Sequence, residues 1–146
     1  MRKLSAYLLA ALLLAACTPE QPAGENTFYV SIPPLRSIVE GIVGDDFKIE
    51  VLEPTPRQFV ELNKAQLIFN VGLIDFETTL LGKVGDQAKV VNLSRGIDLI
   101  AGSCSHGHHG HDHGHAHGVD PHVWTSPKAL QTMAANAYEA IRNAYP

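Results

Sequence analysis

The chain has 146 residues, of which 45% are hydrophobic and 18% charged, a composition typical of folded globular proteins and not of disordered or collagen-like ones. Its formal net charge of −4, with the eight histidines neutral, argues against the basic surface that nucleic-acid binding requires. The length predicts one small domain, and the charge predicts no nucleic-acid partner.

The N-terminus has the pattern of a secretory signal. A short positive start, Met1-Arg2-Lys3, precedes an apolar run over residues 4–14 that is too short to span a bilayer stably. Leu14-Ala15-Ala16-Cys17 resembles the lipobox of bacterial lipoproteins, in which the cysteine is lipidated and becomes the first residue. We therefore expect a signal peptide at 1–16, a lipidated N-terminus and tether at 17–26, and a domain at 27–146. This predicts an extracytoplasmic protein, anchored by Cys17 to a bacterial membrane, in the periplasm or at the cell surface.

The rest of the chain alternates strand and helix patterns. Apolar and β-branched runs predict strands at 27–32, 47–52, 67–71 and 89–93. Helices are expected between Pro33 and Gly44, from Thr55 to about Lys64, on the apolar face of Leu73, Phe76 and Leu80, and from Ser126 to about Arg142. Thr55 and Gln58 have capping-box spacing, with Pro56 at the first helical position. The order predicts an α/β fold, an open four-stranded parallel sheet with helices on both faces.

Ligands of such sheets bind outside the carboxyl ends of the strands, which directs attention to the loops after Ile32, Leu52, Val71 and Leu93. No Gly-rich phosphate loop, nucleophile elbow or HExxH motif is present in the sequence. The carboxylate pair Asp45-Asp46 follows Gly44 and is best explained as a solvated turn. The sequence therefore favours a binding protein over an enzyme.

A histidine-rich segment at 103–118 is the strongest chemical signal. Its glycines argue against a packed helix or strand and predict a loop. Clustered imidazoles bind Zn²⁺, Ni²⁺ or Cu²⁺ at neutral pH, so the segment is predicted to bind metal. The alternative interpretation is that the segment is a solvated linker. Cys104, left without a disulfide partner if Cys17 is lipidated, is inert, cross-linked between chains or a further ligand. The candidate metal ligands in the loop are His106, His108, His109, His111, His113, His115 and His117.

One more histidine, His122, lies just after this loop, beside Trp124. A single histidine next to an aromatic residue is more often structural than functional. Its position at the mouth of the predicted sheet, next to a metal-collecting loop, favours the ligand role.

Four segments in this order resemble a known family, the zinc and manganese substrate-binding lipoproteins of ABC importers, of the high-affinity zinc-uptake type. They are Val30-Ser31-Ile32-Pro33-Pro34-Leu35, Glu53-Pro54-Thr55-Pro56-Arg57-Gln58, Phe69-Asn70-Val71-Gly72-Leu73 and Asp120-Pro121-His122-Val123-Trp124. The resemblance implies two α/β lobes, joined by a long helix, that clamp one metal ion through three His and one Asp or Glu. Carried over by motif, His122 is the ligand of the D-P-H-x-W segment.

The other expected ligands are missing from this sequence. The family's second N-terminal His precedes the E-P-T-P segment, but here Val51-Leu52 runs straight into Glu53-Pro54. The remaining two belong to the C-terminal lobe, and this chain stops at Tyr145-Pro146, about where the linking helix would begin. We expect either a fragment or truncated product, or a single-lobe variant that holds its metal with the loop and His122; Glu53 and Cys104 are conceivable substitutes.

The resemblance predicts an extracytoplasmic, lipid-anchored zinc-binding component of a metal ABC importer, with a membrane permease as partner. Zn²⁺ is the expected ion, since imidazole donors disfavour Mn²⁺, while Ni²⁺ and Cu²⁺ stay open. The alternative is a metal-buffering or sensing lipoprotein that acts through its His-rich loop without a permease. A third and weaker interpretation is surface adhesion.

Overall fold

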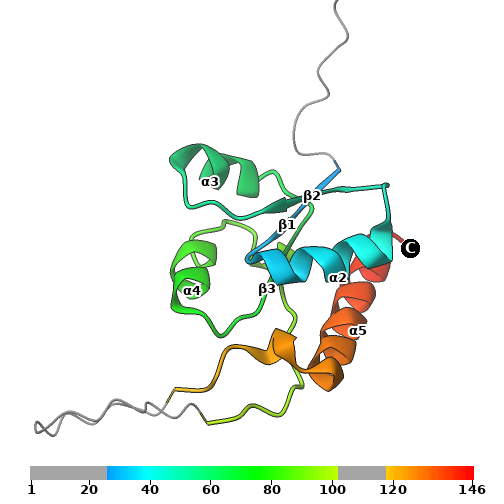
Figure 1. The fold of residues 1–146 in the computed structure, drawn as a ribbon. Coiled ribbons are helices and arrows are strands. Elements are labelled where there is room, and N and C mark those ends of the chain that lie inside the picture. Colours follow the sequence, from blue (N-terminus) through cyan, green and yellow to red (C-terminus); the bar gives the residue numbers. More distant parts are fainter. Residues whose placement is uncertain (1–25, 102–117) are drawn as a thin grey trace, which may run out of the picture.

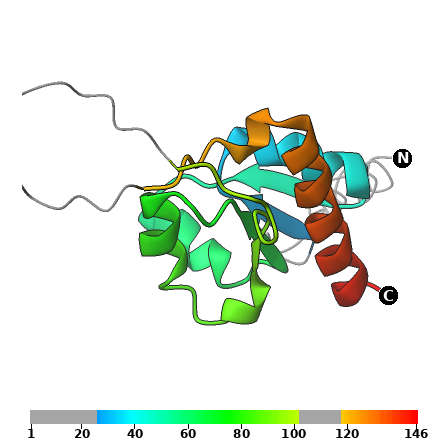
Figure 2. The ribbon, with the colours of Figure 1, turned by 90° about the horizontal axis from the view of Figure 1, so that it is seen from below.

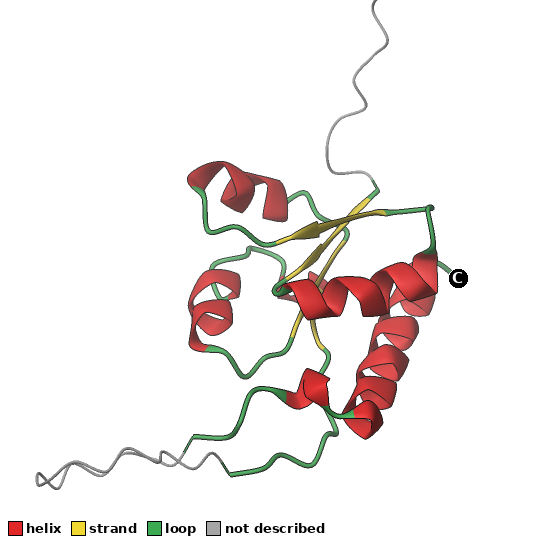
Figure 3. Ribbon diagram, viewed as in Figure 1, coloured by secondary structure: helices red, strands yellow, loops and turns green. Residues whose placement is uncertain are grey.

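The computed structural model describes residues 26–101 and 118–146. Strands and helices alternate along the chain (Figure 1), and every strand and helix predicted for this part is present (Figure 3). The elements are β1 (Thr27–Val30), α2 (Pro33–Val43), β2 (Lys48–Val51), α3 (Pro56–Leu62), β3 (Leu67–Asn70), α4 (Asp75–Leu81), the 3₁₀ turn η1 (Gln87–Lys89), β4 (Val90–Asn92), the 3₁₀ turn η2 (Val123–Thr125) and α5 (Pro127–Ala144).

The four strands form one parallel sheet in the order β2-β1-β3-β4, which confirms the predicted architecture. Central β1 pairs with β2 from Thr27↔Lys48 to Val30↔Val51, and β3 pairs with β4 from Ile68↔Val90 onwards. Because the strands are parallel, all of them begin at one edge of the sheet and end at the other. We call these the amino edge and the carboxyl edge.

Two layers of helices cover the sheet (Figure 2): α2 and α5 lie on one face, α3 and α4 on the other. Side chains alternate between the faces along each strand, so Phe28 and Val30 of β1 pack under α2 and α5, while Tyr29 packs on the opposite side. Both faces are buried, as is usual for parallel sheets with crossover helices.

Helix α5 carries the apolar face that the sequence predicts. Met133, Ala137 and Ile141 are buried in the core against α2 and the strands, and Leu130 packs at its margin. Ser126 caps the helix, since its Oγ accepts from the backbone N–H of Ala129 at 3.4 Å. Neither α5 nor any other helix of the described ranges is long and apolar enough to cross a membrane.

At the start of α3, only half of the predicted capping box forms. The backbone N–H of Gln58 donates to Oγ1 of Thr55 at 3.2 Å, but the Gln58 side chain does not return to Thr55. Instead its Oε1 accepts from the backbone N–H of Glu53, and its Nε2 donates to the carbonyl of Val51 at 3.2 Å. Gln58 is buried, so its amide pairs the backbone groups left open where β2 ends.

The predicted apolar face of α4 is correct only in part. Leu73 and Leu80 pack at the margins of the core, but Phe76 is 41% exposed, and the buried residues of α4 are Glu77 and Leu81. Successive helical residues are about 100° apart, so a shift of one position turns a different face inward. The cause is Glu77, whose carboxylate has hydrogen-bond donors only in the interior of the protein.

Tyr29 generates a prediction for alkaline pH. Burial of the phenol, followed by the nearby carboxylates of Glu50 and Glu61, raises the pKa of Tyr29 to about 12. The folded state therefore holds this proton more tightly than the unfolded chain, whose tyrosines ionise near pH 10. We expect the stabilisation to be complete below pH 10 and to be lost as the pH rises to about 12.

The measurement is the tyrosinate absorbance of the wild type and of Tyr29→Phe during an alkaline titration. Their difference should show one step near pH 12. A difference step near pH 10 would contradict the burial of an uncharged phenol at this position.

Candidate metal centre

The two ends of the histidine-rich segment meet at a short neck. Ala101 and Val119 form an antiparallel bridge, and the backbone N–H of Asp120 donates to the carbonyl of Ile100 at 2.9 Å. The predicted loop ligands (His106, His108, His109, His111, His113, His115 and His117), together with Cys104 and Cys17, lie outside the described residues. Val119, on one side of this neck, is followed directly by Asp120-Pro121-His122.

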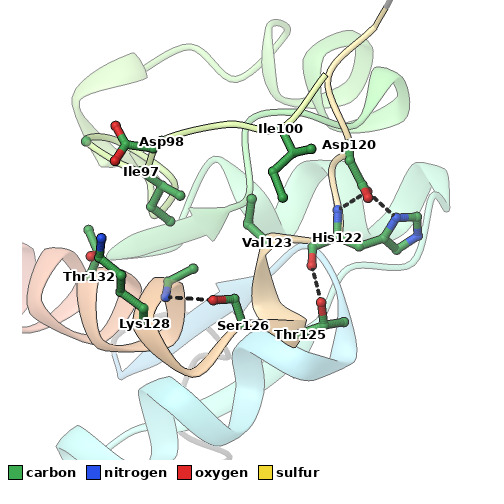
Figure 4. A pocket seen from close by; sticks show the side chains of 12 residues that line it. Ile97, Asp98, Ile100, Asp120, His122, Val123, Thr125, Ser126, Lys128 and Thr132 are labelled. Atoms are coloured by element: carbon green, nitrogen blue, oxygen red, sulfur yellow. Dashed lines mark hydrogen bonds and ion pairs between the residues drawn. The ribbon is translucent and has the colours of Figure 1, made fainter. Parts of the chain in front are cut away.

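Asp120 orients the imidazole of His122 (Figure 4). One carboxylate oxygen, Oδ1, pairs with the His122 ring at Nδ1 over 2.6 Å and with the His122 backbone N–H over 2.9 Å. The bond from the backbone N–H, and then that from the ring, hold the pKa of Asp120 below its usual range. A carboxylate paired with Nδ1 selects the tautomer in which Nε2 is unprotonated and free to bind a metal.

The His122 backbone is fixed from the other side as well. Thr125 donates through Oγ1 to the His122 carbonyl at 2.8 Å, and the Trp124 ring lies 5.1 Å from the imidazole. The imidazole itself is 63% exposed and is turned outward, away from Ile97 and Asp98 (Figure 4). The site therefore presents an anchored and exposed ring whose Nε2 makes no hydrogen bond to any other described residue.

A cleft of about 210 Å³ lies behind this segment, between the chain that follows β4 and the first turns of α5. Its walls are largely apolar, with Ile97, Ile100 and Val123 inside, and polar groups at the rim. The lining residues are Gly96, Ile97, Asp98, Ile100, Asp120, His122, Val123, Thr125, Ser126, Lys128, Ala129 and Thr132.

Within 26–101 and 118–146, no group of three or more His, Cys, Asp or Glu side chains comes close enough to hold a metal ion. Glu53, the substitute ligand considered from the sequence, is exposed at the end of β2. Zinc bound by protein normally takes three or four donors. The described part thus supplies one prepared imidazole, and further donors have to come from elsewhere.

A second feature of the carboxyl edge was not predicted from the sequence: the buried carboxylate of Glu77. Oε1 accepts from Oγ of Ser31 and from the backbone N–H of Val71 at 3.0 Å, and Oε2 accepts from the N–H of Gly72 at 2.7 Å. Glu77 is fully buried and ties the ends of β1 and β3 to α4. An acidic residue within an apolar helix, just after a strand that ends in Asn-Val-Gly, was the available signal.

The side chain of Asn92 packs against Gly72, and hydrogen bonds lead from there to α5. Gly72 has a φ of 77°, and a Cβ at this position would lie 2.3 Å from Nδ2 of Asn92. Oδ1 of Asn92 accepts from the N–H of Ser94 at 2.8 Å, and Asn136 of α5 donates to the carbonyls of Leu93 and Arg95. These contacts hold the segment that leads into the cleft wall.

An open α/β domain that presents an oriented, exposed imidazole at its carboxyl edge has the build of one lobe of a metal-binding solute-binding protein. The chain belongs to the family of the periplasmic zinc-uptake complex component A, whose model matches residues 29–146.

Similar proteins carry names consistent with this family. The chain is 32% identical over 162 residues to the high-affinity zinc uptake system protein ZnuA of Bacillus subtilis, covering 89% of this chain and 48% of that protein. It is 26% identical over 169 residues to the zinc-binding lipoprotein AdcA of Streptococcus pneumoniae, covering 100% of this chain and 33% of that protein.

A crystal structure of a ZnuA deletion mutant with zinc bound superposes with a TM-score of 0.66 at 26% identity, covering 83% of this chain and 47% of that one. The chain thus spans a third to about half of the length of these proteins.

Asp120→Asn tests the orientation of His122. The amide cannot hold the ring as a carboxylate does, so we expect zinc affinity at the His122 site to fall by about tenfold to a hundredfold. The measurement is competition with a chromophoric chelator. Asp98→Asn is the matched control, because Asp98 lines the same cleft and points away from the ring. Equal losses in both variants would refute the orienting role.

Glu77→Gln tests the buried carboxylate. The amide keeps the shape but replaces one acceptor oxygen by a donor that faces other donors, so we expect a loss of about 1–3 kcal/mol in the free energy of unfolding. Asp75→Asn, exposed in the same helical turn, should cost less than about 1 kcal/mol. Urea denaturation measures both, and an equal effect of the two variants would contradict the structural role of Glu77.

Proposed function

We propose that this protein captures Zn²⁺ outside the cytoplasm as the substrate-binding component of a metal ABC importer and passes the ion to a membrane permease. The family and the names of the relatives support this assignment. Those names describe binding and uptake, and the proposal is likewise a binding function without catalysis. Zn²⁺ is the preferred ion because imidazole donors disfavour Mn²⁺; Ni²⁺ and Cu²⁺ are the competitors to test.

The observation that carries the proposal is the geometry of His122. Its ring is exposed, its Nδ1 is engaged by Asp120 at 2.6 Å, and its Nε2 has no hydrogen-bond partner among the residues that the structure describes. A buried structural histidine would instead use its ring nitrogens within the protein. The arrangement is that of a ligand prepared to bind a metal.

The further donors come from the histidine-rich segment in this proposal. Its ends meet at Ala101 and Val119, next to Asp120, so the segment leaves and re-enters the domain beside His122. Its seven histidines are His106, His108, His109, His111, His113, His115 and His117. Two or three of these together with His122 would complete a tetrahedral site.

The location also belongs to the proposal. Residues 1–16 act as a lipoprotein signal peptide, and Cys17 carries the lipid that holds the domain at a bacterial membrane. The relative from Streptococcus pneumoniae is itself named a lipoprotein.

Zinc competition on the mature chain, residues 17–146, tests the function. The variants are His122→Gln, a form with the seven loop histidines replaced by glutamine at unchanged length, and the combination of both. We expect one tight site in the wild type, a loss of about tenfold or more in each single form, and no tight binding in the combined form.

Two outcomes would contradict the proposal, the first its carrier function and the second its choice of ion. If His122→Gln binds zinc as tightly as the wild type, all binding resides in the loop, and a metal buffer without a permease becomes the better explanation. If Mn²⁺ displaces Zn²⁺ at comparable concentration, the imidazole donor set is wrong.

A further inference from the structure

Three lysines lie in the turns at the amino edge of the sheet, in the segments that precede β3 and β4. Lys64 lies in the turn between α3 and β3, Lys83 follows α4, and Lys89 immediately precedes β4. A hydrogen bond of 3.1 Å from the N–H of Gly85 to Oδ1 of Asn63 holds the first two turns side by side. We call Lys64, Lys83 and Lys89 the lysine patch.

Three lysines stand against one acidic residue in the turns of the lysine patch. Asp86 is the acidic residue within its turns, and one of its oxygens is occupied by the N–H of Ala88. Lys64, Lys83 and Lys89 have no ion-pair partner among the residues that the structure describes. By contrast, Arg36, Arg57 and Arg95 pair with glutamates.

The patch is an exception on an acidic domain. Over 26–101 and 118–146 the chain carries nine basic and twelve acidic residues. The other half of the amino edge has no such excess of positive charge, since Lys48 pairs with Glu50, and Asp45 and Asp46 lie there with Arg142. The lysine patch is therefore where this domain attracts an anionic surface.

The described part of the chain begins at this same edge, where β1 starts (Figure 1). Asn26 precedes β1, and its carbonyl accepts from the N–H of Lys48 at 2.9 Å. Cys17 is nine residues earlier, and nine residues reach at most about 30 Å. A lipid on Cys17 therefore keeps the amino edge close to the membrane, which is the one step that rests on the proposed function.

We propose that the lysine patch rests on the membrane, with its ammonium groups on the phosphates of anionic phospholipids. Basic side chains next to a lipid anchor strengthen attachment to anionic bilayers in this way. The carboxyl edge is then turned toward the aqueous phase. Helix α5 runs from Ser126 beside His122 to Arg142 near the amino edge, and its 18 residues are about 27 Å long. Before the domain meets a permease, the end that carries His122 thus stands clear of the bilayer.

The test couples the mature chain, with Cys104→Ser, through the Cys17 thiol to maleimide lipid on vesicles. Vesicles of phosphatidylcholine alone are compared with vesicles that contain about one third phosphatidylglycerol. Lysine acetylation is read by mass spectrometry. On anionic vesicles we expect Lys64, Lys83 and Lys89 to react about threefold more slowly, Lys128 at the carboxyl edge to be unchanged, and about 0.5 M salt to remove the difference. Equal rates on both vesicles would overturn the proposal.

Matched variants keep the result specific. Energy transfer from Trp124, the single tryptophan, to labelled headgroups reports the orientation of the domain relative to the bilayer. We expect the same transfer efficiency on anionic and neutral vesicles for the triple variant Lys64→Gln/Lys83→Gln/Lys89→Gln. The control Arg36→Gln/Arg57→Gln/Arg95→Gln loses the same charge and should give the transfer efficiencies of the wild type. Identical behaviour of the two triple variants would also overturn it. The vesicle experiment uses a chemically coupled lipid and no zinc. A failure of the membrane proposal can therefore be distinguished from a failure of the proposed zinc-binding function.

Discussion

A buried negative charge organises the carboxyl edge of this domain. The Glu77 carboxylate is fully buried and accepts hydrogen bonds from Ser31 after β1 and from Val71 and Gly72 after β3. An unpaired charge at this depth would be very costly, so the three donors must stay in place as long as the protein is folded. This requirement fixes the rotation of α4 and the turn at Gly72. The contacts that continue from Gly72 toward α5 then hold the wall of the cleft beside His122.

Sequence patterns predicted most of the architecture, because strands buried on both faces leave continuous apolar runs and crossover helices leave 3.6-residue periods. The apolar face of α5 is an example, with Met133, Ala137 and Ile141 buried as expected. The site was predicted less completely. The roles of Asp120 and Glu77 depend on the backbone N–H groups of turns, and no periodicity records where those groups point. For the same reason Phe76 was wrongly placed in the core and Gln58 was assigned to the wrong partner.

In the proposed function, metal binding is divided between one fixed residue and a segment with many histidines. His122 lies on a segment held by Asp120, Thr125 and the cap of α5, and so it offers one donor at a defined position. In the proposed function the remaining donors come from a segment rich in interchangeable histidines. The single fixed ligand determines where the metal ion binds, while many equivalent ligands raise the probability that an ion is captured. That combination suits an ion that must be both collected and released.

The neck at Ala101 and Val119 has a consequence for how such a protein can change. Because Ala101 and Val119 pair across this bridge, the fold of the described residues does not depend on how many residues join them, and closing a longer loop costs only about 0.6 kcal/mol for each doubling of its length. Insertions, deletions and histidine replacements in that segment therefore leave the sheet and the Asp120–His122 pair almost unaffected. In the proposed function, the capacity for metal can then be adjusted by mutation separately from the architecture that presents His122.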